Sequence, residues 1–124
     1  MRRRSAGVPL CVAVVAALST AAPAGAGDGE CPIILPAADR LEKAFELVSA
    51  SGTPPYVAGQ VRNALSPLYG LTSPAAIDLR IRSDMLASSI DASDPYRPAS
   101  PAQTAGDLAA ARQQLAAARD YCAP

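Results

Sequence analysis

Two cysteines near opposite ends of the predicted domain restrict the fold of this chain more than any other feature. Cys31 precedes the first predicted helix and Cys122 follows the last one. In an exported chain an isolated cysteine pair is by default a disulfide. Such a bridge brings the start and the end of the domain together, which an up-and-down helical bundle achieves only with an even number of helices. The pair therefore favours four helices over three.

The first 26 residues have the three parts of a secretory signal peptide. Met1–Arg4 is basic, Leu10–Leu18 is an uninterrupted apolar run, and Ala24-Gly25-Ala26 provides a small-x-small cleavage site. A bilayer-spanning helix needs about 20 apolar residues, roughly twice this run. We therefore predict a signal peptide at 1–26, no stable membrane anchor after its cleavage, and a single secreted or extracytoplasmic helical domain at 27–124.

The predicted domain has a thin core. Cys11 leaves with the signal peptide, and the remaining 98 residues hold only 20 large aliphatic or Phe side chains. A Cys31–Cys122 bridge would contribute about 4 to 5 kcal/mol on the chain-entropy model, which is comparable to the whole stability of a small domain. We therefore predict that the disulfide is essential. The alternatives are two free thiols or a bridge between two molecules.

Apolar spacing predicts two helices in the first half of the domain. The first runs from about Pro36 to Ser51, where Gly52 is its natural stop. The second runs from Pro55 to about Leu65 and is ended or kinked by Pro67. If the second segment is too short to be a full helix, the alternative is an irregular three-helix layout with the disulfide across it.

Two longer helices follow. The third predicted helix, Ser73–Ile90, opens with an N-cap serine followed by proline. The proline-rich segment Asp91–Ala102 is an exposed loop. The fourth helix begins at Thr104, with Asp107 in a variant of the capping box, and ends near Tyr121. The fold class is therefore all-α, a small up-and-down bundle of three to four helices closed by one disulfide.

The third predicted helix is apolar on two sides. One face carries Ile77, Ile81 and Met85, and the nearly opposite face carries Leu79, Leu86 and Ile90. Such a helix needs two partners. One explanation is a central helix enclosed by its neighbours, and the other is a helix whose second face receives a ligand or another chain. In the second case, the candidate binding residues are Leu79, Leu86 and, next to the helix, Tyr56 and Tyr69.

The tyrosines also have two explanations. Tyrosine is favoured at interfaces because it offers a large contact area at a small entropic cost. The alternative is that Tyr56 and Tyr69 cover the ends of a core that is short of aromatic residues.

Catalytic chemistry finds little support in this sequence. The chain has no His, which excludes His-based triads and zinc sites that use His. It has no phosphate-binding glycine motif, and the domain carries eight basic against eleven acidic side chains without a basic patch for nucleic acid. The carboxylates of Glu42 and Glu46 lie beside Arg40 and Lys43, which predicts a solvated, salt-linked surface. We assign no catalytic residue and no metal ligand.

These observations favour a secreted, non-enzymatic interaction module that binds a protein partner, without nucleic acid and without a cofactor. The first alternative is a carrier of an apolar or planar small molecule, such as a lipid or a haem whose iron a tyrosine would bind. The second is a small helical enzyme that clamps an anionic substrate with Arg, Lys and Glu side chains. The high usage of Ala, Arg and Pro suggests a bacterial genome of high GC content.

Overall fold

The computed structural model describes residues 29–49 and 51–124, so the predicted signal peptide lies outside the described residues. Within that part there are four α-helices, one short 3-10 helix and no strand. The elements are α2 (Cys31–Phe45), α3 (Tyr56–Leu65), η2 (Ser66–Leu68), α4 (Pro74–Asp91) and α5 (Pro101–Tyr121). The predicted all-α fold is confirmed.

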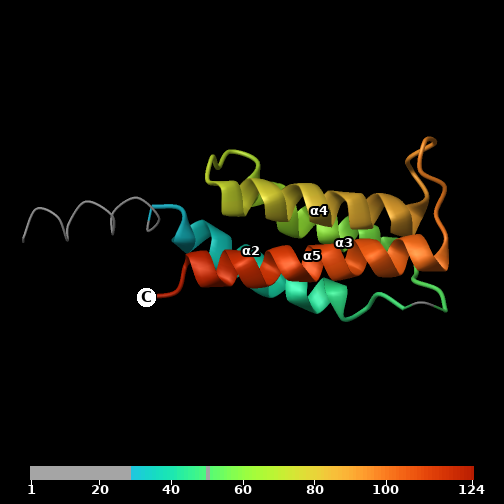
Figure 1. Cartoon of the computed structure of the whole chain (residues 1–124), viewed down its shortest axis with the longest axis horizontal. Coiled ribbons are helices and arrows are strands. Elements are labelled where there is room, and N and C mark those ends of the chain that lie inside the picture. Colours follow the sequence, from blue (N-terminus) through green and yellow to red (C-terminus); the bar gives the residue numbers. More distant parts are fainter. Residues whose placement is uncertain (1–28, 50) are drawn as a thin grey trace, which may run out of the picture.

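The four helices run alternately up and down along one axis (Figure 1). α2 packs on α3, α3 on α4 and α4 on α5, and α5 returns to pack against α2. The start of α2 and the end of α5 therefore lie at the same end of the bundle, together with the connection from η2 to α4 (Figure 1). The other end carries the α2–α3 and α4–α5 loops. The even number of helices that the cysteine pair favours is confirmed for the described residues.

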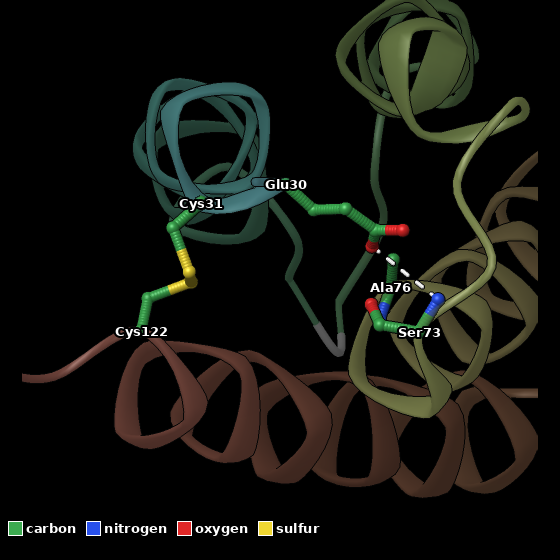
Figure 2. The surroundings of a disulfide bond; sticks show 5 residues. All are labelled: Glu30, Cys31, Ser73, Ala76 and Cys122. Atoms are coloured by element: carbon green, nitrogen blue, oxygen red, sulfur yellow. Dashed lines mark hydrogen bonds between the residues drawn. A yellow bond between two sulfur atoms is a disulfide. The ribbon is translucent and has the colours of Figure 1, made fainter. Parts of the chain in front are cut away.

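A disulfide joins Cys31, the first residue of α2, to Cys122, which follows α5, with the two Cα atoms 5.6 Å apart (Figure 2). Beside it, the Glu30 carboxylate accepts hydrogen bonds from the backbone amides of Thr72 at 3.0 Å and Ser73 at 3.3 Å. The disulfide and Glu30 therefore hold three segments together at this end: the start of α2, the start of α4 and the end of α5.

These hydrogen bonds change the titration of Glu30. Hydrogen bonding from Ser73, and next from the Thr72 amide, lowers the pKa of the Glu30 carboxyl below its ordinary value because it stabilises the charged form. The contact therefore depends on the ionised carboxylate.

The core is built largely from small side chains. Nine of the twenty buried apolar residues in the described part are alanines. The largest fully buried side chains include Ile34, Leu41, Phe45, Leu65, Leu68, Leu79 and Leu86. Alanines let helix backbones approach one another closely, so few large side chains are enough to fill the space between four helices. The thin core expected from composition is therefore packed through helix proximity.

The first helix begins and ends earlier than predicted, at Cys31 and Phe45 rather than Pro36 and Ser51. Pro32 stands in the first turn, where a missing backbone N–H costs nothing, and Pro36 is tolerated inside the helix on its exposed side. Beyond Phe45, hydroxyl groups bind the backbone: the Ser49 amide donates to Thr53 Oγ1 at 2.8 Å. Such local bonds compete with helix continuation, which explains the early end.

The start of α4 is confirmed, and the start of α5 differs from the prediction. Ser73 Oγ accepts a hydrogen bond from the Ala76 amide, as expected of an N-cap. In α5 the N-cap is Ser100, whose hydroxyl accepts from the Gln103 amide at 3.0 Å, with Pro101 next in the chain. Thr104 therefore lies inside the helix rather than at its cap, because the Ser-Pro pair that opens α4 is repeated three residues upstream of it.

A charged network joins α3 to α4. Arg62 Nη1 lies 2.6 Å from Asp91 Oδ2, and Arg62 Nε lies 3.9 Å from Asp84 Oδ1. The hydrogen bond from Arg62 lowers the pKa of the Asp91 carboxyl, and the same contact raises the pKa of the Arg62 guanidinium. This pair fixes the outer edge of α3 to the end of α4.

Candidate functional site

The structure does not bring the four predicted binding residues together. Leu79 and Leu86 are fully buried in the core, on the side of α4 that faces the bundle. Tyr56 and Tyr69 are 60% and 54% exposed. Tyr56 is the first residue of α3, whereas Tyr69 follows η2 beyond the other end of that helix, which has 10 residues and is therefore about 15 Å long.

The outer face of α4 carries the second apolar cluster. Ile81 is 46% exposed there, while Ile77 and Met85 are partly buried. The neighbouring Arg80 guanidinium lies 5.0 Å from the centre of the Tyr69 ring, a cation–π contact that covers part of both side chains. The helix is thus apolar on two sides as predicted, with its Leu79 side inside and its Ile81 side outside.

A groove between α2 and α3 combines apolar and cationic groups more closely. Its volume is about 540 Å³, within the range of ligand sites. It is lined by Arg40, Lys43, Ala44, Leu47, Gln60, Asn63 and Ala64. The two alanines are buried, one from each helix, and leave the space open because their side chains are small. Leu47 stands beside them, 45% exposed.

The groove has a positive charge without a matching carboxylate. Arg119 of α5 lies 3.0 Å from Asp39 and 2.5 Å from Glu42, so these two carboxylates of α2 pair with α5. In the part of the chain that the structure describes, neither Arg40 nor Lys43 has an ion-pair partner. The predicted ion pairs within α2 are therefore replaced by pairs between α2 and α5, and no acidic side chain among the described residues lines the groove.

Lys43 lies at the border of this groove. It also lines an adjacent hollow of about 330 Å³, together with Asp39, Glu42 and Glu46. Arg40 does not line that acidic hollow. Of these two cationic side chains, Lys43 lines both hollows, whereas Arg40 lines only the groove.

Helical register adds residues to the same surface. Ile33 and Arg40 are seven residues apart and so lie on one side of α2, and Leu47, two residues after the end of α2, continues the same spacing. On α3, Tyr56 precedes Gln60 by one turn and lies on the side that carries Gln60 and Asn63. We call these six residues the α2–α3 face. Tyr56 is thus the predicted site residue that the structure places on this face.

Comparison with known proteins adds no relative. No family model, curated protein or solved structure matches the chain.

Sequence reasoning does not single out Leu47, Gln60 or Asn63. Leu47 falls outside the apolar stripe that defines the first helix, and the signal that marks it is its seven-residue spacing from Arg40, which repeats the spacing from Ile33 to Arg40. Gln60 and Asn63 can be recognised as groove residues only from the packing of α3 against α2, and the sequence alone does not show which helices pack together.

A buried polar cluster joins α4, the following loop and α5. The Ser89 hydroxyl donates a hydrogen bond to Asp107, and Arg97 Nη2 lies 3.0 Å from both oxygens of the same carboxylate. Ser89 also borders a small hollow of about 170 Å³ lined largely by hydroxyl groups. That volume is below the range of about 300 to 1,000 Å³ that is typical of ligand sites. The cluster is best explained as a structural link.

Among the described residues, no helix combines the length and hydropathy needed to cross a bilayer. The same residues contain no group of three or more His, Cys, Asp or Glu side chains placed to hold a metal ion.

Proposed function

We propose that this protein is a secreted, non-enzymatic interaction module that binds another protein through the α2–α3 face. The observation that carries the proposal is the groove itself, where exposed Leu47 and unpaired Arg40 flank the small side chains of Ala44 and Ala64. Exposed apolar side chains beside a small-residue depression, with polar groups around them, are typical of binding surfaces.

The secreted location is part of the proposal. The basic, apolar and small-residue segments within 1–26 support export. The Cys31–Cys122 disulfide supports it as well, because such bonds persist mainly in oxidising compartments.

The test is site-specific photo-crosslinking of the full chain in cells that make the protein. A photoreactive residue replaces Leu47 or Asn63 on the α2–α3 face, or Ile81 on α4 as the matched control. Leu47 and Ile81 are equally suited to the comparison because their exposed fractions are 45% and 46%. Crosslinked products are identified by mass spectrometry.

We expect positions 47 and 63 to crosslink to one and the same protein, and position 81 to give no such product. Equal crosslinking from all three positions, or crosslinking from position 81 alone, would contradict the proposal. Capture of a lipid or another small molecule at positions 47 and 63 would replace it with the carrier function.

A further inference from the structure

We infer that the partner presents an acidic, amphipathic α-helix to the α2–α3 face. This inference rests on the proposed function and names the chemistry of the binding segment.

The shape favours a linear segment. α2 and α3 are antiparallel neighbours joined by one loop (Figure 1). The groove, called the furrow below, is lined by residues of both helices and therefore follows their shared direction. On α2 the face begins at Ile33 and the helix ends at Phe45, two residues before Leu47, so the helical part of the face is about 18 Å long. A helix of three to four turns has about the same length, and its side-chain ridge fits the furrow between two helices.

The walls of the furrow favour a helical rather than an extended segment. Both walls are helices, whose backbone N–H and C=O groups are mostly bonded within the helix. An extended segment would find no strand edge to pair with and would leave its own backbone groups unsatisfied in the interface. A helix bonds its own backbone groups and can lay its apolar side into the furrow.

The depth of the furrow provides positions for apolar side chains. Ala44 and Ala64 form its floor, and their small side chains leave room for a Leu or Phe of the partner. Leu47 stands beside this floor, and Tyr56 lies near the same end because α2 and α3 are antiparallel. These two exposed side chains can cover the partner's apolar stripe from one end of the furrow.

The charge of the furrow indicates which residues should flank the apolar stripe of the partner helix. Arg40 and Lys43 stand on the α2 side, and none of the described carboxylates lines the groove. Gln60 and Asn63 on the α3 side offer amide N–H donors. A helix with Glu or Asp on either side of its apolar stripe would therefore meet cations on the α2 wall and hydrogen-bond donors on the α3 wall.

The test uses a designed peptide as the probe and the full-length protein as the receptor. The peptide has about 18 residues, with Leu at helical i, i+3, i+4 and i+7 positions and Glu on both sides of that stripe. A second peptide has Lys in place of every Glu. Binding is measured by fluorescence anisotropy at low and high salt, and circular dichroism of the mixture reports helix formation.

We expect the Glu peptide to bind as a helix, with affinity that falls at high salt, and the Lys peptide not to bind. Arg40→Glu should weaken binding of the Glu peptide by about tenfold or more, while Arg82→Glu on the outer side of α4 should leave it unchanged. Likewise Leu47→Ser should weaken binding and Ile81→Ser should not. All four residues are exposed, so these variants keep the fold, which their melting curves verify.

Three results would overturn the inference. The first is no binding of the Glu peptide, and the second is equal binding of both peptides. The third is tight binding of the protein to phosphatidylglycerol vesicles that Arg40→Glu abolishes, which would assign the face to an anionic lipid surface. If position 47 still crosslinks to a protein while the Glu peptide fails to bind, the interaction function stands and only the helical, acidic nature of the partner is wrong.

Discussion

The Arg97 guanidinium nitrogen Nη2 lies 3.0 Å from each oxygen of the Asp107 carboxylate. Arg97 belongs to the loop after α4 and Asp107 to the second turn of α5, so the contact holds a proline-rich loop against the bundle. Ser89 at the end of α4 donates to the same carboxylate. Asp107 thus has a structural role at the end of the bundle opposite the disulfide.

Replacement of Asp107 should be costly for stability. We expect Asp107→Ala to lower the free energy of unfolding by about 2 to 3 kcal/mol, because it leaves the Ser89 hydroxyl without its acceptor and the Arg97 charge without its partner. Asp120→Ala, an exposed position on the same helix, is the control and should change it by less than about 0.5 kcal/mol. Urea denaturation measures both. Equal effects of the two variants would mean that the buried cluster contributes nothing.

Loss of the disulfide should have a larger effect. The bridge closes a loop with a sequence separation of 91 residues, for which chain entropy predicts about 4 to 5 kcal/mol. We expect Cys31→Ser with Cys122→Ser to lower the melting temperature by more than about 15 °C, since 1 kcal/mol corresponds to about 4 to 8 °C in a domain of this size. A change of only a few degrees, measured by calorimetry, would show that the packed helices do not need the bridge.

The stability of the fold should be constant between about pH 5 and 8 and should fall in acid. The chain has no His, so no side chain with an ordinary pKa titrates in that window. The pKa values of Glu30 and Asp91 are lowered from ordinary values of 4.5 and 3.8, so both carboxylates stabilise the folded state above those values. That stabilisation is lost as the pH falls through the lowered pKa values of the folded state.

A neutral variant tests the contribution of Glu30 to this pH dependence. In Glu30→Gln the free energy of unfolding should fall less in acid than it does in the parent, because one of the two carboxyls with a lowered pKa is gone. Chemical denaturation at several pH values between about 2 and 7 measures the difference. A curve for Glu30→Gln that is parallel to that of the parent at every pH would rule out a role for this carboxylate.

The two apolar sides of α4 should respond differently to the same substitution. Leu86→Ser removes a fully buried side chain and introduces a hydroxyl into the core, so we expect it to destabilise the fold by about 3 to 5 kcal/mol or to unfold it. Ile81→Ser should change the free energy of unfolding by less than about 1 kcal/mol, because Ile81 is 46% exposed. Thermal unfolding compares the stabilities of the two variants. A similar loss of stability in both would place Ile81 in the core as well.

Much of the fold can be predicted from the sequence because its signals are local. Ser73 and Pro74 mark the start of α4, and the recurrence of Leu108, Ala111, Leu115 and Ala118 defines the inner side of α5. The cysteine pair adds one long-range restraint, which is enough to favour four helices. The errors lie at helix ends, where hydroxyl groups such as those of Ser49 and Thr53 compete with the helix and propensity alone does not decide.

The candidate site is harder to predict, since it depends on which helix packs beside which. The two-sided pattern of α4 correctly indicates a second apolar face, but it does not say that Leu79 and Leu86 point inward and Ile81 outward. The pairing of Arg119 with Asp39 and Glu42 is also a tertiary event. Arg40 has no carboxylate three or four positions away on α2, and among the described residues no other element supplies it with one. The groove appears only when these long-range contacts are in place.

The central claim is that the α2–α3 face is the binding surface, and chemical-shift mapping tests it most directly. The labelled protein is titrated with the Glu peptide, and its backbone amide signals are followed by NMR. We predict that the shifted signals cluster at residues 33–47, in α2 and the turn after it, and at residues 56–64 of α3, with Leu47, Gln60 and Asn63 among the largest changes. Shifts that instead centre on Ile77, Ile81 and Met85 would place the binding surface on the outer side of α4 and contradict the claim.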